Sequence, residues 1–148
     1  MRNAIQTSGY IMSTSTINLS NLNGTNGFTI NGIDEYDQSG RSVSSAGDVN
    51  GDGIDDLIIG AWAGDPDGNS RAGESYVVYG SDTRSGAALD LSDLNGTNGF
   101  RIDGIDASDQ SGNSVSSAGD VNGDGIDDLI IGANLADPDG NSNAGESY

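Results

Sequence analysis

Oxygen-bearing side chains alternate with glycines in a short run that begins at Asp48. Counted from position 1, the candidate donors are the side chains at positions 1, 3, 5 and 9 and the backbone carbonyl at position 7: Asp48, Asn50, Asp52, Asp56 and Ile54. A hard cation such as Ca²⁺ takes about six to eight oxygen ligands, and a tight loop with alternate residues turned inward supplies them. The spacing therefore predicts a calcium-binding loop.

The same run recurs 72 residues later, from Asp120 onward. Its candidate ligands are Asp120, Asn122, Asp124, Asp128 and the Ile126 carbonyl. A polar turn rich in Asp, Asn and Gly is the plainer alternative. That alternative is less favoured, because closely packed carboxylates repel one another without a counter-ion and the whole arrangement is repeated. We expect about two Ca²⁺ ions per chain.

The residues around these donors decide how the loop is closed. Gly51 and Gly53 allow the backbone to curl through positive φ angles. Asp55 and Asp127, at position 8, are expected to point away from the ion. An EF-hand would require Glu at position 12, where Ile59 stands. The apolar run 57–59 instead predicts a buried strand, so the loop is expected to be the turn of a β-hairpin.

A period of 72 residues indicates a repeat architecture. We divide the chain into a leader or short strand over residues 1–16 and two repeats over 17–88 and 89–148, the second truncated. Each repeat predicts four strands, which in the first are 42–47, 56–61, 74–79 and 99–103, and residues 28–31 predict a fourth strand of an earlier unit. With 24 glycines and no helical periodicity, the chain is expected to be all-β, without a long helix. Stacked four-stranded antiparallel units are typical of β-propeller blades, here about two per chain.

The run from Gly40 to Ala61 resembles the FG-GAP repeat of the integrin α-chain β-propeller, most closely its bacterial relatives, and the resemblance covers nearly all of residues 17–148. The Phe-Gly of the family name is Ser39-Gly40 here, and its Gly-Ala-Pro is Gly60-Ala61-Trp62. The calcium residues match by position, so the resemblance implies the same metal chemistry. It also implies a propeller of seven blades, and propellers close with about four to eight.

Fewer than three blades in one chain leave three arrangements open. The chain is a fragment of a longer propeller, or identical subunits form a ring in which the N-terminal strand of one completes the last blade of the next. In the third, strand 28–31 is shared with the chain's own C-terminal blade. Residues 1–16 lack the apolar segment of a signal peptide, which predicts another export route or an internal piece of a longer chain.

Composition limits the classes of function. The formal net charge is −18, which argues against nucleic acid and anionic membranes as partners and favours cations. The absence of His and Cys excludes Ser-His-Asp and Cys-His catalytic sites. Paired carboxylates leave glycosidase-like chemistry formally open. They recur in each repeat, however, so we expect no enzyme activity. No run is long enough to cross a membrane.

A second acidic surface is expected at the end of each blade opposite the calcium loops. It comprises Asp34, Asp37, Asp65, Asp67 and the equivalents Asp106, Asp109, Asp137 and Asp139. These residues suggest either a ligand-facing surface with a further ion at Asp65/Asp67 and Asp137/Asp139, or ordinary turns. Trp62, replaced by Asn134 in the second repeat, is either a binding aromatic or a packing residue.

The function predicted from the sequence is that of a Ca²⁺-stabilised β-propeller segment of an extracellular or cell-surface protein. It would act in adhesion, with an unidentified protein or glycan ligand, and contact further blades from the parent chain or from identical subunits. One alternative is a non-catalytic accessory propeller of a secreted hydrolase or lyase. The other is a self-assembling structural ring.

Overall fold

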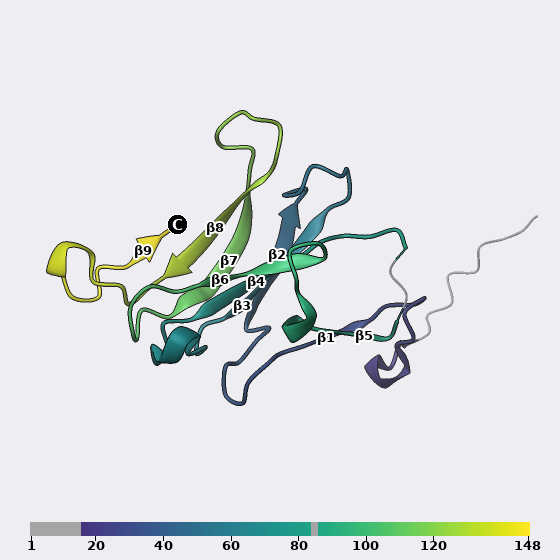
Figure 1. Ribbon diagram of the computed structural model, residues 1–148, viewed down its shortest axis with the longest axis horizontal. Coiled ribbons are helices and arrows are strands. Elements are labelled where there is room, and N and C mark those ends of the chain that lie inside the picture. Colours follow the sequence, from purple (N-terminus) through teal and green to yellow (C-terminus); the bar gives the residue numbers. More distant parts are fainter. Residues whose placement is uncertain (1–15, 84–85) are drawn as a thin grey trace, which may run out of the picture.

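The described residues form three β-sheets joined by polar loops, and two of these sheets are stacked on each other (Figure 1). The computed structural model describes residues 16–83 and 86–148. The leader or short strand predicted for residues 1–16 thus lies almost entirely outside the described residues. Within the described part, the helices are single turns of 3-10 helix: η1 (Leu19–Asn21), η2 (Pro66–Gly68), η3 (Leu91–Asp93) and η4 (Pro138–Gly140). The expectation of an all-β chain without a long helix is confirmed.

The first blade is a four-stranded antiparallel sheet with the order β2-β3-β4-β6. Its strands are β2 (Ser42–Gly47), β3 (Asp56–Ala61), β4 (Glu74–Val78) and β6 (Gly99–Asp103). The second blade has three strands, β7 (Ser111–Gly119), β8 (Asp128–Ala133) and β9 (Glu146–Ser147). The strands predicted for the first repeat are confirmed, although the third ends at Val78 and not at 79. Short apolar runs mark the buried strands β3 and β4.

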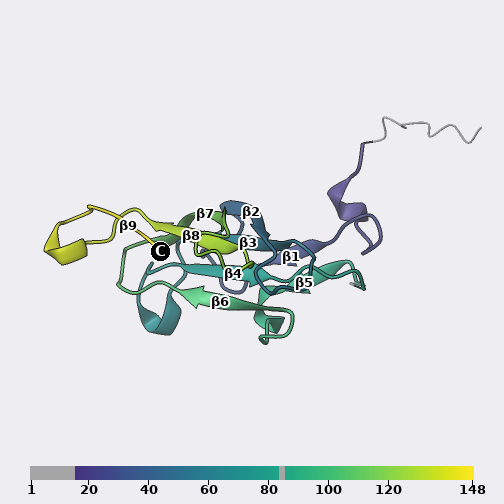
Figure 2. The same cartoon turned by 90° about the horizontal axis from the view of Figure 1, so that it is seen from above.

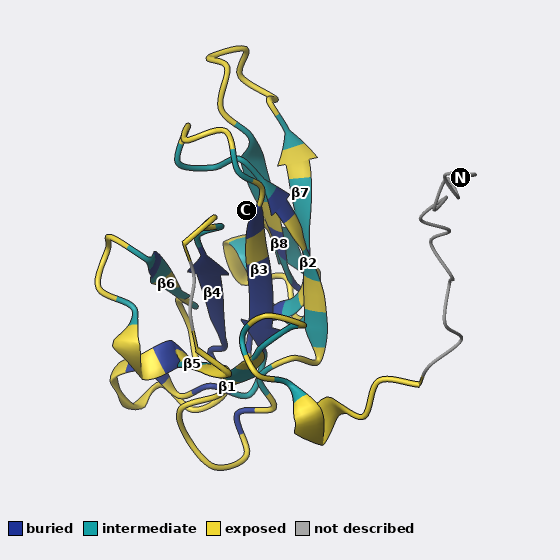
Figure 3. Cartoon of the chain, turned by 90° about the vertical axis from the view of Figure 1, so that its right-hand side faces the viewer, coloured by how far each residue is buried: buried dark blue, intermediate teal, exposed yellow. Residues whose placement is uncertain are grey.

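The two blades pack face to face, as the view from above shows (Figure 2). Their shared core contains five buried residues from both sheets: Ala46, Ile58, Val77, Val115 and Ile131. Strands β3 and β4 are the most deeply buried (Figure 3). The backbones approach so closely that a Cβ on Gly60 would lie 2.0 Å from the carbonyl oxygen of Gly112. Small residues along the inner strands therefore make this stacking possible.

The other face of the first blade is partly covered by a pair of strands, of which the sequence predicted only the one at 28–31 and not its partner or their pairing. Strand β1 (Thr29–Asn31) pairs in parallel with β5 (Ala88–Asp90). Their side chains Ile30 and Leu89 pack against a second core that includes the buried Tyr76. The arrangement in which strand 28–31 is shared with the C-terminal blade is therefore wrong for this structure: β1 lies against the first blade instead.

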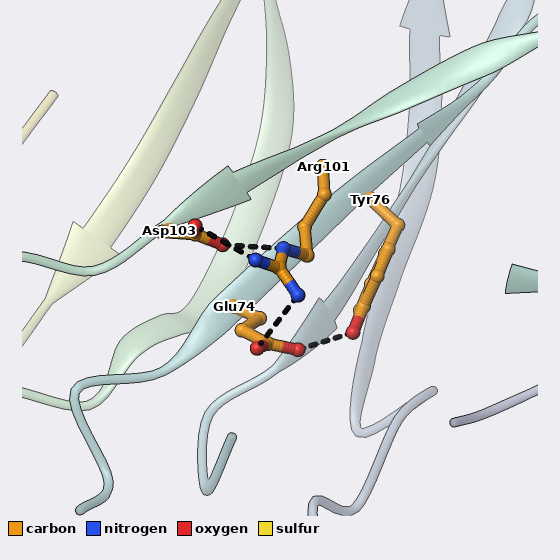
Figure 4. Close-up of polar contacts among 4 residues, drawn as sticks. All are labelled: Glu74, Tyr76, Arg101 and Asp103. Atoms are coloured by element: carbon orange, nitrogen blue, oxygen red, sulfur yellow. Dashed lines mark hydrogen bonds and ion pairs between the residues drawn. The ribbon is translucent and has the colours of Figure 1, made fainter. Parts of the chain in front are cut away.

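A polar cluster joins the outer strands β4 and β6 (Figure 4). The buried Glu74 accepts a hydrogen bond from the Tyr76 hydroxyl, and its Oε1 lies 3.5 Å from Nη1 of Arg101. Arg101 in turn pairs with Asp103, with Nε and Oδ1 separated by 2.6 Å. Burial raises the pKa of Glu74, and the hydrogen bond from Tyr76 and the charge of Arg101 oppose this rise.

Replacing Glu74 with Gln is expected to flatten the pH dependence of stability. Because its pKa is raised in the folded state, Glu74 contributes stability that is full below the unfolded carboxyl pKa, about 4.3. That contribution is lost as the pH rises through the folded value. Urea unfolding between about pH 4 and 8 measures the change. Exposed Glu35→Gln controls for the loss of one negative charge, and equal pH profiles for wild type and Glu74→Gln would contradict the expectation.

Candidate metal centres

The first predicted loop is the turn of the β2–β3 hairpin, and it is built around Asp48. The Asp48 carboxylate accepts backbone hydrogen bonds from Gly51 (2.7 Å), Asp52 (3.1 Å) and Gly53 (2.8 Å). These bonds, that from Gly53 most strongly, hold the pKa of Asp48 below its usual value. Asp48 is thus an ionised carboxylate at neutral pH, the state that a cation requires of its ligand.

The next two predicted ligands lie together in the same turn. Oδ1 of Asn50 accepts from the Asp52 amide at 2.8 Å, and Nδ2 of Asn50 donates to Oδ2 of Asp52 at 3.0 Å. Oδ1 of Asp52 accepts from the Ile54 amide at 2.9 Å. Gly51 and Gly53 have φ angles of 76° and 86°, as the sequence predicts for a loop that closes on itself. The first three side-chain donors therefore line one compact turn.

Asp56 has a second role that sequence reasoning missed. Its side chain is fully buried; Oδ2 accepts from the Val49 amide at 3.0 Å and Oδ1 from the Gly80 amide at 2.7 Å. Burial raises the pKa of Asp56, and the two backbone hydrogen bonds oppose this rise. The carboxylate thus joins the loop to the chain leaving β4. Because Gly80 lies outside the repeated motif, local spacing gives no signal of this contact.

The second loop repeats this geometry between β7 and β8. Asp120 accepts from the amides of Gly123, Asp124 and Gly125 at 2.7, 3.0 and 2.9 Å. Nδ2 of Asn122 lies 3.3 Å from Oδ1 of Asp128, which brings positions 3 and 9 together. Figure 1 shows both loops projecting at the same end of the blades. As predicted, they lie on one face.

The residues fit a hard cation by ligand type and by the path of the loop. Every donor is an oxygen, as Ca²⁺ prefers. Arg101 is the cation in each ion pair found among residues 16–83 and 86–148, so the loop carboxylates have no cationic partner there. Within those ranges, however, no group of three acidic side chains converges on one point, and their oxygens accept hydrogen bonds from backbone amides. The ligand sets of both loops thus remain a prediction.

The second acidic surface lies at the other end of the first blade. Asp37 and Asp65 line one pocket there with Trp62 and Arg71. Burial raises the pKa of Asp37, and the charges of Asp34 and Asp65 add to the rise. Asp65 also accepts from the Arg71 amide at 2.6 Å, which favours the interpretation as ordinary turn chemistry.

The corresponding acidic turn of the second blade is similar. Asp137 accepts from the Asn143 amide at 2.5 Å, the bond that Asp65 makes in the first repeat. Burial raises the pKa of Asp109, and the charges of Asp106 and Asp137 add to the rise. In the first repeat, Nε1 of Trp62 donates to Gln38 at 3.2 Å. Neither turn gathers three acidic side chains around one point, so a further ion at either stays an untested prediction.

Comparison with known families decides the nature of the repeat. A family model described as FG-GAP repeat matches residues 39–78 and 111–148, which together make more than half of the chain. The chain belongs to the FG-GAP repeat family. Each matched segment runs through three strands of a blade and contains one predicted metal loop. FG-GAP repeats are non-catalytic propeller repeats, and the fold class predicted from the sequence is confirmed.

Similar proteins carry FG-GAP-like sequence in larger contexts. The chain is 33% identical over 117 residues to integrin alpha-PS2 of Drosophila melanogaster, covering 76% of this chain and 8% of that protein. It is 35% identical over 98 residues to phosphatidylinositol-glycan-specific phospholipase D of Bos taurus, covering 66% and 11%. The chain thus spans about a tenth of the relatives it matches. In the described residues, no helix is long and apolar enough for a membrane span.

Proposed function

We propose that this chain is a calcium-binding segment of a β-propeller, with one Ca²⁺ in each of the two loops. The observation that carries the proposal is the repeated acidic turn, closed by glycines and without a cationic partner among the described residues. Asp48, Asn50, Asp52, Asp56 and the Ile54 carbonyl would hold one ion, and the equivalents from Asp120 to Asp128 the other. The ion offsets carboxylate repulsion and fixes the hairpin, so its binding free energy adds to folding free energy.

The role of the whole protein follows from the relatives. We place the segment in an extracellular or cell-surface protein that acts in adhesion or in protein or glycan binding, which the similarity to integrin alpha chains supports. The similarity to a phospholipase D favours the second candidate, a non-catalytic accessory propeller beside a catalytic domain. In both cases the blades themselves perform no catalysis. A catalytic domain in the parent open reading frame would select the second candidate.

The exposed outer faces of the two stacked blades are suited to contact further blades. Val43 on the first blade is 64% exposed, whereas its equivalent Val115 is 8% exposed between the blades. Ile130 on the second blade is 45% exposed, whereas its equivalent Ile58 is fully buried. The same side chains are therefore covered wherever a blade stands beside them. The parent chain or identical subunits would supply the missing blades.

Light scattering with calcium and then with chelator tests the assembly. A discrete trimer or tetramer that dissociates in chelator would establish a calcium-dependent ring of this chain. A monomer, or aggregates without defined mass, would assign the missing blades to a longer parent chain.

Replacing Asp52 with Ala is expected to remove one of two calcium sites. Asp52 is exposed, so its loss leaves the apo fold almost unchanged and lowers the melting temperature only when calcium is present. Isothermal titration calorimetry should show one remaining site, and Asp124→Ala should remove the other. An equal loss of thermal stability in chelator and in calcium would contradict a metal-ligand role for Asp52.

A further inference from the structure

Asp127 of the second loop contacts the first loop and not its own turn. Its Oδ2 accepts a hydrogen bond from the Asp48 amide at 3.0 Å, and its own amide donates to the Asp48 carbonyl at 3.1 Å. Asp48 is position 1 of the first loop, while Asp127 lies between positions 7 and 9 of the second. A reciprocal pair of hydrogen bonds thus joins the two candidate metal loops across the blade interface.

Gly47 provides the space for this contact. A Cβ on Gly47 would lie 2.0 Å from Oδ2 of Asp127, so no other residue fits without moving the carboxylate. Its repeat equivalent Gly119 has nearly the same φ, 69° against 71°, but a Cβ there would meet nothing within 4 Å. The contact is therefore made at one loop and absent at the other, although the two loop sequences are identical.

Asp55 is the equivalent of Asp127 in the first loop, and it is exposed. It has the same position in the same motif, but the described residues contain no loop of a preceding blade with which it could form a hydrogen bond. The chain thus contains its own control: one position-8 aspartate that reaches a neighbouring loop and one that does not.

We propose that Asp127 is a positioning residue that couples the two metal loops, so that calcium bound in the second loop favours binding in the first. This inference rests on the proposed calcium function, but the contact itself does not need the metal. An ion in the second loop would restrain the backbone on both sides of Asp127, because its neighbours Ile126 and Asp128 are the predicted ligands. The restrained carboxylate then holds the peptide of Asp48 in place. The conformational entropy cost of ordering the first loop is therefore met before that loop binds its ion. By linkage, the first ion favours the second to the same extent.

Amide hydrogen exchange in chelator tests the contact without calcium. In the wild-type chain the Asp48 amide should exchange about tenfold more slowly than the Asp120 amide, and Asp127→Ala should remove this difference. Asp127→Asn keeps an acceptor oxygen and should retain part of the protection. Asp55→Ala should leave both amides unchanged. Equal exchange of Asp48 in the wild type and in Asp127→Ala would overturn the proposed contact.

Calcium titration followed by the amide signals of Gly53 and Gly125 measures the affinity of each loop separately. Asp127→Ala should weaken binding in the first loop by about five- to tenfold, a typical size for coupling between sites. Asp55→Ala is the control. It removes the position-8 carboxylate of the first loop itself, so its effect on the calcium affinity of that loop shows what this carboxylate contributes within one loop. Equal weakening of the first loop by both variants, or none by Asp127→Ala, would overturn the coupling.

A second pair of variants keeps the test independent of Asp127 itself. Gly47→Ala should displace the Asp127 carboxylate and weaken the first loop, whereas Gly119→Ala, at the same positive φ but without the clash, should weaken its own second loop less. In Asp124→Ala, which disables the second loop, the first loop should also bind calcium several-fold more weakly. One outcome would separate the two proposals. If neither the wild type nor any variant binds calcium, but the Asp48 amide is still protected from hydrogen exchange, the proposed calcium function fails and the contact between Asp127 and Asp48 stands.

Discussion

Removing calcium with a chelator is expected to lower the free energy of unfolding of this chain by about 5 kcal/mol. A ligand that binds only the folded state adds about 2.7 kcal/mol per site when its free concentration is about 100 times its Kd. The two loops together would thus add roughly twice that value. For a chain of this size, the loss corresponds to a fall of about 10–20 °C in melting temperature. The effect is large because the loop carboxylates, Asp48 and Asp120 among them, have no other cation nearby in the described residues.

Thermal unfolding followed by circular dichroism, in excess calcium and in excess chelator, measures this difference. Magnesium at equal ionic strength is the control, since Mg²⁺ demands a smaller octahedral site and keeps its water. A melting temperature that rises in calcium and not in magnesium supports two loop sites. Equal melting temperatures in calcium and chelator would refute the proposed structural role of the metal.

Replacing Asp56 with Ala is expected to be the most destabilising single change in the loops, by roughly 3–5 kcal/mol even in chelator. The carboxylate is fully buried and satisfies the partly buried amides of Val49 and Gly80, so its removal leaves two donors without their acceptor. A buried donor left unsatisfied costs about 1–3 kcal/mol. Asp56 therefore stabilises the fold before any ion binds, in contrast to Asp52.

Asp128→Ala is the matched control for this prediction. Asp128 has the same place in the second loop, where its Oδ2 accepts from the Val121 amide at 2.9 Å, but its side chain is only partly buried. We expect a loss of about 1–2 kcal/mol in chelator. Urea unfolding of both variants without metal measures the difference. Equal losses for Asp56→Ala and Asp128→Ala would show that burial and the Gly80 contact add nothing.

The loops and the strands beside them can be predicted from local sequence alone. Asp48, Asn50 and Asp52 lie within five residues of one another, so their common turn depends on local backbone conformation and on Gly51 and Gly53. The alternation of Phe28 and Ile30 with polar neighbours likewise marks a strand with one buried face. The exact repetition of residues 42–61 at 114–133 then implies a second blade with the same local structure. These features need no knowledge of distant contacts.

Which parts of the two repeats meet depends on long-range contacts that form only in the folded chain. The pairing of β1 with β5, the bond from Gly80 to Asp56 and the contact of Asp127 with Asp48 all join residues far apart in the chain. Identical sequences cannot reveal such contacts, because Asp55 and Asp127 have the same neighbours in the chain and different neighbours in space. The difference arises from stacking: a blade covers one face of its partner, and each outer face lacks that cover. Position in the stack, which local sequence does not encode, therefore decides the role of each copy.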